Sequence, residues 1–247
     1  MIVCVLNQKG GCGKTTIALN LASYWSDLIH NLNFNKVTLV DTDHQRSLTD
    51  WHAAGESGLE LVAADRVSML ERLMPDPDTI YIIDGASKAD DMCIASIKLA
   101  DIVIVPIKPS PMDQWSVTPI MRMLYERQQL ADGVPTAAFV ISMTAANSTL
   151  DKDMRQKFDQ CEEQFNLLHA STADRVIYKK SAMIGNSVFD SNPRYTQSER
   201  TSLAKAQGEI QSIALEVSHL ANKTMQQPIQ KEVENNEIKL HAVPTSV

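Results

Sequence analysis

Cysteine is scarce in this chain of 247 residues, and the four cysteines lie far apart, at Cys4, Cys12, Cys93 and Cys161. No C-x-x-C pair is present, so the sequence predicts neither a zinc site nor a disulfide framework. The pattern favours four reduced thiols in a cytoplasmic protein.

Glycine, proline and long apolar runs are also limited. Nine glycines and ten prolines are too few for a fibrous or disordered chain. No apolar run reaches the ~20 residues that a membrane span needs. The first residues lack the basic region and the cleavage site of a signal peptide. We therefore expect a cytoplasmic protein.

Positive charge is in deficit, because 23 Lys and Arg residues stand against 30 Asp and Glu residues, for a net charge of −7. This balance argues against a protein whose whole surface binds nucleic acid. Any contact with DNA must therefore come from a local basic patch.

What the sequence does contain is an alternation of short strands and helices. The strand candidates are rich in Val and Ile and mostly do not alternate with polar residues, which is typical of strands buried on both faces. They occupy residues 2–6, 37–40, 80–83, 102–105 and 137–141. Helical patterns occupy residues 15–26, 66–73, 89–99, 150–165 and 198 to about 220.

This order predicts a single α/β domain with a mostly parallel, twisted sheet covered by helices on both faces. We place the domain at residues 1–220. Residues 221–247 are rich in Gln, Asn, Glu and Lys and carry too little apolar surface to offset the entropy of ordering, so they are expected to form a flexible polar tail.

The strongest motif is a glycine-rich loop between the first strand and the first helix, where a phosphate-binding P-loop belongs. Its glycines let backbone amides approach phosphate oxygens, and the following helix N-terminus adds partial positive charge. Lys14 is expected to neutralise the β- and γ-phosphates, and Thr15 to bind Mg²⁺. The expected nucleotide-binding residues here are Gly10, Gly11, Cys12, Gly13, Lys14, Thr15 and Thr16.

Two predicted strands run into aspartates, at Asp41-Thr42-Asp43 and at Asp84. Ligands bind at the carboxyl ends of parallel strands, so these carboxylates are candidates to organise Mg²⁺ and water. The alternative for Asp41 or Asp43 is a capping role on a neighbouring helix over residues 47–54.

The P-loop departs from the strict G-x-x-x-x-G-K-[ST] pattern, with Gln8 where the first glycine belongs and a second lysine at Lys9. This form resembles the deviant Walker A motif, K-G-G-x-G-K-[ST], of the ParA/MinD superfamily. The resemblance implies an ATPase in which ATP and Mg²⁺ bridge a homodimer, and in which Lys9 reaches the partner's nucleotide. Lys9, Lys14 and Asp43 would then act at the reaction centre, with Asp43 positioning the attacking water. Thr15, Asp41 and Asp84 would serve the metal.

The closest resemblance is to the small ParF-like plasmid partition ATPases, and it covers roughly residues 1–220. It includes the proline-rich stretch after the fourth predicted strand, which flanks adenine and the dimer interface in those proteins. Pro109, Pro111 and Asp113 are therefore expected to contact the nucleotide. The alternative is a plain strand-to-helix turn stiffened by proline. The resemblance also includes Gly185-Asn186-Ser187-Val188-Phe189.

Members of this superfamily do different work, so the fold does not choose the function. A membrane-docking tail is not expected, because residues 221–247 lack a basic amphipathic face. An iron–sulfur cluster is not expected either, because Cys93 has no second cysteine at a comparable strand end.

A locally basic region could bind DNA phosphates without reading sequence, the alternative being a solvated helix face. Its candidate residues are Arg175, Lys179, Lys180 and Arg194.

The function that the resemblance implies is ATP-dependent DNA partition in a bacterium or archaeon. An ATP-bound dimer or polymer would bind nonspecific DNA and associate with the nucleoid. A centromere-binding partner of the ParB or ParG kind would stimulate hydrolysis and dissolve that state. Two alternatives stay open: an ATPase that positions a protein cargo by the same chemistry, and a non-enzymatic nucleotide-binding scaffold.

Overall fold

The computed structural model describes residues 1–55, 57–73, 76–86, 90–145, 150–159, 165–190 and 192–241; the side chains of residues 111–116, 157, 159 and 224–241 lie outside this description. Of the residues singled out above, Cys161 lies outside the described residues, and the side chains of Pro111 and Asp113 do as well. Within the described part, no helix combines the length and apolar character needed to cross a membrane.

Seven parallel strands form one sheet in the order β3-β2-β4-β1-β5-β6-β7. The strands are β1 (Ile2–Val5), β2 (Lys36–Asp41), β3 (Glu60–Ala63), β4 (Thr79–Asp84), β5 (Ile102–Ile107), β6 (Thr136–Thr144) and β7 (Asn166–Ala173). β1 is central, with β4 on one side and β5 on the other. The chain therefore changes direction across the sheet at β1, the kind of switch point at which such sheets bind ligands.

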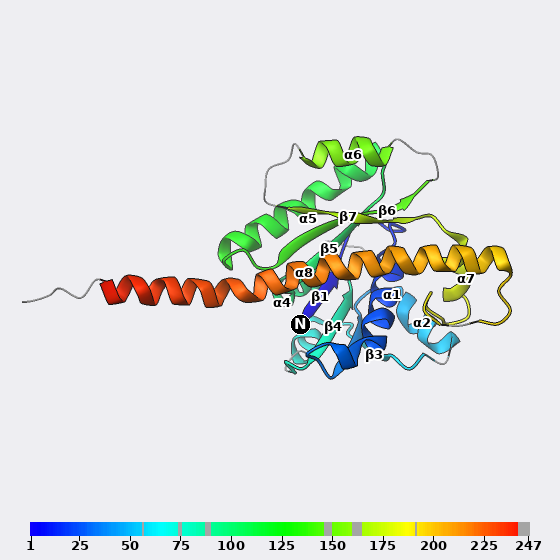
Figure 1. Cartoon of the computed structure of the whole chain (residues 1–247), viewed down its shortest axis with the longest axis horizontal. Helices are drawn as coiled ribbons and strands as arrows, with labels where there is room; N and C mark the ends of the chain where they lie inside the picture. The colour runs from blue at the N-terminus through cyan, green and yellow to red at the C-terminus, as the bar shows by residue number, and fades with distance from the viewer. Residues whose placement is uncertain are drawn as a thin grey trace, which may run out of the picture.

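Helices cover both faces of the sheet (Figure 1). Those packed on one face are α1 (Lys14–Asp27), α2 (Ser47–Ala54), α7 (Val176–Ala182) and α8 (Gln197–His241). Those on the other are α3 (Val67–Arg72), α4 (Asp91–Leu99), α5 (Pro111–Leu130) and α6 (Leu150–Asp159). A short 3₁₀ helix, η1 (Ile29–Asn31), follows α1. The predicted doubly covered α/β sheet is confirmed.

The central strands are apolar on both faces because each face carries its own core. Val3 and Val5 of β1 point into the core that contains α1 and α8. Cys4 and Leu6 point into the opposite core, with α4 and α5. Successive residues of a strand face opposite sides, so a strand between two cores has no position left for an exposed polar residue.

The two edge strands do not follow this rule, and the Val- and Ile-rich pattern did not find them. β3 has no fully buried residue and β7 alternates between buried and less buried positions. Both lie at an end of the sheet, where part of the strand faces water. Of the predicted helix at residues 150–165, Leu150–Asp159 is helical and Phe165 is not, while residues 160–164 lie outside the described residues.

The edge of the sheet at β7 is covered by α8. Glu216 accepts hydrogen bonds from the backbone N–H groups of His169 and Ala170, at 2.8 and 2.7 Å. Two turns earlier, Glu209 accepts the backbone N–H of Ala173 at 3.3 Å. Unpaired N–H groups on an edge strand can template pairing with another chain. The two glutamates satisfy these groups and fix the helix against the sheet.

Helix α8 begins with a capping box. The Thr196 hydroxyl and backbone N–H contact the Glu199 carboxylate, and the Glu199 N–H donates back to the Thr196 hydroxyl, which satisfies N–H groups that have no partner within the helix. The predicted end near residue 220 is wrong, because α8 continues to His241 and extends past the body of the domain in Figure 1. The polar composition after residue 220 thus does not stop the helix.

We expect Glu216→Ala to lower the free energy of unfolding by about 1–3 kcal/mol, since it removes both acceptors from two edge N–H groups. Glu216→Gln keeps one carbonyl oxygen and should lose less. Urea unfolding followed by circular dichroism measures both. Lys205→Ala, an exposed position on the same helix, is the matched control. An unchanged midpoint for Glu216→Ala would show that water replaces the glutamate without loss.

Candidate nucleotide-binding site

The P-loop connects β1 to α1 through two left-handed glycines. Gly11 has φ 69° and Gly13 has φ 91°, conformations that side-chain-bearing residues rarely adopt. Gly13 is the N-cap of α1, and its carbonyl accepts the Ile17 N–H at 2.9 Å. The loop thus places the N-terminus of α1 at the carboxyl end of the central strand, as a phosphate site requires.

Lys14 is buried at the start of α1, with 6% of its surface exposed. Its ammonium donates to the Lys9 carbonyl at 3.2 Å, and the Cys12 thiol donates to the same oxygen at 3.2 Å. A buried ammonium at this turn of the loop can also pair with an anion, and such a charge-assisted pair is stronger than a contact with a neutral carbonyl.

The loop is tied to the two strands beside it. Asn7 donates to the Pro106 carbonyl at 2.6 Å and accepts the Lys9 N–H at 3.0 Å. Pro106 is accommodated in β5 because its nitrogen faces the side on which β1 has already ended. Ser142 of β6 donates to the Cys12 carbonyl at 2.8 Å. These bonds anchor the P-loop to β5 and β6.

Asp84 lies at the carboxyl end of β4, where only 1% of its surface is exposed. One carboxylate oxygen accepts the Thr15 hydroxyl hydrogen at 2.6 Å. The other is buried and has no hydrogen-bond partner among the described residues. Burial raises the pKa of this carboxyl to about 7; the Thr15 hydrogen bond opposes the shift, and the charges of Asp41 and Asp43 add to it.

The unsatisfied Asp84 oxygen beside the Thr15 hydroxyl fits a hydrated Mg²⁺ ion. A buried carboxylate oxygen without a donor is unfavourable on its own, and a hydrated cation would supply the missing partner. No group of three or more His, Cys, Asp or Glu side chains that could enclose a metal occurs in the described portion. That arrangement suits Mg²⁺, which keeps several waters and uses few protein ligands alongside phosphates.

Asp41, the last residue of β2, is buried and pairs in register with Asp84. One of its oxygens accepts both the backbone N–H and the hydroxyl of Thr49, at 3.0 and 2.9 Å. Thr49 lies in the first turn of α2, so Asp41 makes the helix-capping contact that the sequence left as an alternative to a metal-supporting role. Its other oxygen accepts the Asp43 N–H at 3.2 Å.

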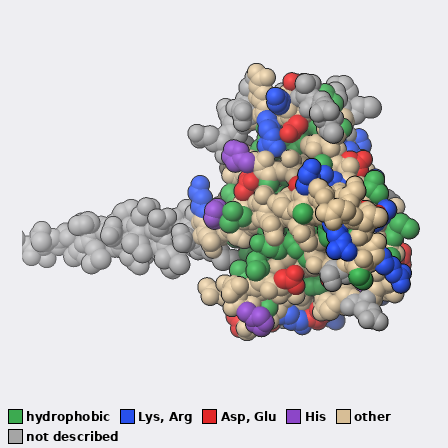
Figure 2. All heavy atoms as spheres, turned by 45° about the vertical axis from the view of Figure 1, so that its right-hand side comes forward, with side chains coloured by type: hydrophobic (Ala, Val, Ile, Leu, Met, Phe, Trp, Pro, Cys, Tyr) green, Lys and Arg blue, Asp and Glu red, His purple; other side chains and the backbone are tan. Residues whose placement is uncertain are grey.

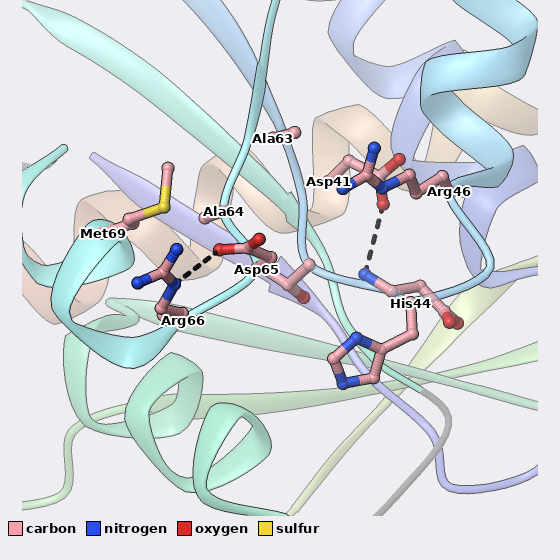
Figure 3. A pocket seen from close by; sticks show the side chains of 10 residues that line it. Asp41, His44, Arg46, Ala63, Ala64, Asp65, Arg66 and Met69 are labelled. Atoms are coloured by element: carbon pink, nitrogen blue, oxygen red, sulfur yellow. Dashed lines mark hydrogen bonds and ion pairs between the residues drawn. The ribbon is translucent and has the colours of Figure 1, made fainter.

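Asp43 lies in a tight loop that ends at a strained residue. Its carboxylate accepts the Gln45 N–H at 3.0 Å, and its carbonyl accepts the Arg46 N–H at 2.9 Å. Arg46 has φ 52°, a left-handed conformation that favours glycine. A cavity of about 600 Å³ lies beside the loop and is lined by the side chains of Asp43, His44, Arg46, Asp65 and Arg66, among others (Figure 3).

A second, narrower cleft lies next to the P-loop, towards β6 and β7. It is lined by Gly13 of the loop and Thr16 of α1, and by Met143, Thr172 and Arg175 from the far side. Met143 has φ 56°, and its N–H donates to the Thr172 hydroxyl at 3.2 Å. The sequence did not predict the far side of this cleft, because β7 was not recognised as a strand. In the proline-rich segment, Pro109 is buried, but the predicted roles of Pro111 and Asp113 rest on side chains that are not described.

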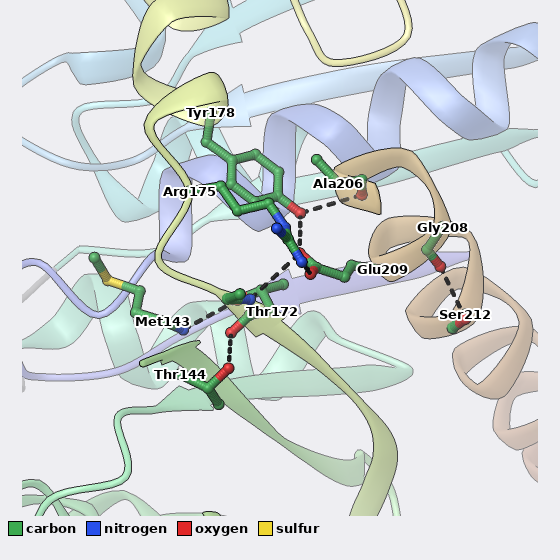
Figure 4. A network of polar contacts seen from close by, with 10 residues as sticks. Met143, Thr144, Thr172, Arg175, Tyr178, Ala206, Gly208, Glu209 and Ser212 are labelled. Carbon is green, nitrogen blue, oxygen red and sulfur yellow. Dashed lines mark hydrogen bonds and ion pairs between the residues drawn. The ribbon is translucent and has the colours of Figure 1, made fainter. Parts of the chain in front are cut away.

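The predicted basic patch is largely paired internally. Arg175 forms an ion pair with Glu209 at 2.6 Å, and Glu209 also accepts the Tyr178 hydroxyl (Figure 4). Lys179 pairs with Asp174, and Lys180 with Glu199. The hydrogen bond from Lys180 is the largest cause of the lowered pKa of the Glu199 carboxyl.

Arg175 is therefore a structural residue that holds α8, which argues against its predicted role in DNA binding. Lys179 and Lys180 are at the surface, where ion pairs are weak, so they remain available to exchange carboxylates for phosphates. In the view of Figure 2, Lys and Arg side chains are dispersed among acidic and neutral ones.

A family model described as the CobQ/CobB/MinD/ParA nucleotide-binding domain matches residues 3–218. The chain belongs to this family. A carboxysome distribution protein A of Halothiobacillus neapolitanus is 26% identical over 199 residues, covering 78% of this chain and 88% of that protein. Protein ParA of Rhizobium radiobacter is 26% identical over 192 residues, covering 76% and 84%. The predicted ParA/MinD membership is confirmed.

Solved structures with ParA/MinD-like folds agree. An alanine variant of Cyanothece McdA in complex with ATP superimposes with a TM-score of 0.63 at 13% identity, covering 87% of this chain and 95% of that one. A Borrelia burgdorferi protein assigned to plasmid partition, bound to AMPPNP, gives 0.60 at 18%, covering 87% and 98%. A Mycobacterium smegmatis cobyrinic acid a,c-diamide synthase with an ATP analogue and magnesium gives 0.54 at 19%, covering 73% and 92%.

The raised pKa of Asp84 predicts a pH-dependent stability for the protein without nucleotide or metal. The native carboxyl binds its proton up to about pH 7, whereas the ordinary value is 3.8. Between these values the native state holds more protons than the unfolded chain, so this group lowers the free energy of unfolding as pH rises. Urea unfolding of wild type and Asp84→Asn at several pH values measures the effect. The stability advantage of Asp84→Asn should grow from pH 4 to 7 and then level off; a constant difference would contradict it.

Proposed function

We propose that this protein is a ParA-type ATPase that binds ATP and Mg²⁺, self-associates in the ATP-bound state and dissociates after hydrolysis. The observation that carries the proposal is the pairing of the P-loop with Asp84, whose carboxylate meets the Thr15 hydroxyl at 2.6 Å. The second lysine of the loop, Lys9, distinguishes this arrangement from an ordinary Walker A site.

Each site residue has a role that follows from its chemistry. Bound Mg²⁺ would neutralise charge on the β- and γ-phosphate oxygens. Thr15 and Asp84 would hold the ion and its water shell, which requires Asp84 to be ionised. Lys14 and the amides at the start of α1 would bind the phosphates. Asp43, which is partly exposed in the loop after β2, would orient the attacking water.

Our candidate for the nucleoside is the narrow cleft beside Gly13 and Thr16, whose volume of about 40 Å³ in the free protein would have to widen on binding. A phosphate chain bound in the P-loop leaves its nucleoside at the rim of the loop, and this cleft is contiguous with that rim. The strained backbone at Met143 supports a binding role, since such conformations cluster at functional positions. The proline-rich segment that includes Pro109 would form the opposite boundary.

For the biological role, we propose DNA partition, with nonspecific DNA bound by the ATP state and a centromere-binding protein that stimulates hydrolysis. The protein would act in the cytoplasm and associate with the nucleoid when ATP is bound. Relatives named ParA and the chromosome-partitioning ATPase Soj support this proposal. Lys179, Lys180 and Arg194 are the surface cations available for DNA phosphates.

A second candidate role is positioning of a protein cargo. The carboxysome distribution protein of Halothiobacillus neapolitanus is matched over 88% of its length, which gives this role as much support from similarity as DNA partition has. The two roles share the nucleotide chemistry and differ in the partner. The partner that accelerates ATP turnover, a centromere-binding protein or a cargo adaptor, distinguishes them.

We expect Lys14→Ala to abolish ATP-dependent self-association, because the phosphates lose their buried cation. Asp43→Ala should instead accumulate the ATP-bound assembly, because hydrolysis is blocked while binding is kept. Light scattering and size-exclusion chromatography with ATP and Mg²⁺ measure both. Lys98→Ala, an exposed lysine on α4, is the matched control. Equal assembly of wild type and Lys14→Ala would refute the proposed switch.

The DNA role predicts that Lys179→Ala combined with Lys180→Ala weakens nonspecific DNA binding about 10-fold or more and reduces its salt dependence, since two phosphate contacts are lost. Lys179 also lines the proposed nucleoside cleft, so ATP turnover without DNA should stay unchanged in Lys180→Ala alone. Gel shifts at several salt concentrations, with Lys98→Ala plus Arg122→Ala as the charge-matched control, measure this. If the Lys179/Lys180 variant and the Lys98/Arg122 control bind DNA equally well, Lys179 and Lys180 do not form a DNA-binding patch.

A further inference from the structure

A third lysine reaches the P-loop from the neighbouring strand. Lys108 directly follows β5, which pairs with β1. A Cβ atom added to Gly11 would lie 4.0 Å from the Lys108 ammonium nitrogen. The ammonium group therefore lies against the glycine turn of the loop, although Lys108 is 97 positions away from Gly11 in the sequence.

The backbone around Lys108 is fixed. Pro106 and Pro109 flank it, and the Ser110 N–H donates to the Lys108 carbonyl at 2.8 Å. The Asn7 side chain, which also binds the Lys9 N–H, holds the Pro106 carbonyl. Because the same asparagine orients the start of the P-loop and the end of β5, the position of Lys108 relative to the loop is set by the fold.

The charge of Lys108 acts on the interior of the loop. Burial raises the pKa of the Cys12 thiol, and the positive charges of Lys14 and Lys108 oppose that rise. In the described part of the chain, no carboxylate lies within ion-pair distance of the Lys108 ammonium. Lys9, Lys14 and Lys108 thus concentrate positive charge at one turn of a protein whose net charge is −7.

Positive charges gathered around one loop attract a polyanion. A triphosphate is a ligand of that kind. We propose that Lys108 is a third phosphate-binding lysine, which contacts the triphosphate bound by the P-loop of its own subunit. This inference rests on the proposed ATP binding and adds a residue that lies outside the P-loop motif.

The test compares nucleotide affinities of Lys108→Gln, Lys108→Met and Lys108→Arg by isothermal titration calorimetry with ATP and ADP. Loss of a charge-assisted contact should weaken ATP binding about 10-fold or more. ADP binding should weaken less, since ADP carries less charge. The salt dependence of ATP affinity should fall in the Gln and Met variants and be restored in the Arg variant. Lys98→Gln on α4 is the matched control.

Wild-type affinity and salt dependence in properly folded Lys108→Gln and Lys108→Met would overturn the inference. Measuring the same pair of substitutions in a Lys9→Ala background, which is expected to stay monomeric, tests the assignment to the same subunit. In the Lys9→Ala background we expect the Lys108 substitutions still to weaken ATP binding about 10-fold. If they no longer did, the assignment of Lys108 to the nucleotide of its own subunit would be overturned. If the wild-type protein bound no ATP, the proposed function itself would fail. If instead wild type and Lys108→Gln bound ATP equally well while Lys14→Ala did not, only the inference about Lys108 would fail.

Discussion

The hydrogen bond between the Thr15 hydroxyl and the Asp84 carboxylate is the contact on which the nucleotide site depends. It joins the start of α1 to the end of β4, two elements that meet only because β1 and β4 are neighbours in the sheet. The backbone reinforces the junction, since the Gly85 N–H donates to the Val5 carbonyl at 3.0 Å. A Cβ atom at Gly85 would lie 1.9 Å from the Leu6 side chain, so any larger residue here would have to displace this fully buried leucine.

This junction separates the charges of the site into two groups. Asp41, Asp43 and Asp84 lie at the ends of β2 and β4, where burial and mutual repulsion raise the Asp84 pKa. Lys9, Lys14 and Lys108 lie around the loop that follows β1. One Asp84 oxygen is buried without a hydrogen-bond partner among the described residues, and Lys9, Lys14 and Lys108 place three positive charges around one loop. Magnesium triphosphate carries the complementary charges for both groups, which is why the free protein is expected to bind it strongly.

The sequence predicted the site better than it predicted the edges of the fold. The P-loop and the strand-end aspartates were found because glycine spacing and the position after a buried strand follow from backbone geometry. β3 and β7 were missed because an edge strand shares only part of its surface with the core. Lys108 could not be assigned a role from the sequence, since its closeness to Gly11 arises from strand order alone. Likewise, Arg175 looked like a surface cation, and only the packing of α8 shows its ion pair with Glu209.

Helix α2 shows why the loop that contains Asp43 and Arg46 can be both strained and well placed. Its first turn is held by Asp41 through Thr49. Its middle is held by the Trp51 indole, which donates to the Asn186 carbonyl at 3.1 Å.

Beyond its end, Gly55 meets Gly185 so closely that a Cβ atom on Gly185 would lie 2.1 Å from the Gly55 nitrogen. These contacts fix α2 at both ends, so the loop that contains Asp43 is anchored on one side by β2 and on the other by a rigid helix. Strain at Arg46 is tolerated when the surrounding structure over-determines the position. Residues 185–189 were noted above only for their resemblance to the family. The contact between Gly55 and Gly185 shows that this segment helps to position the nucleotide site.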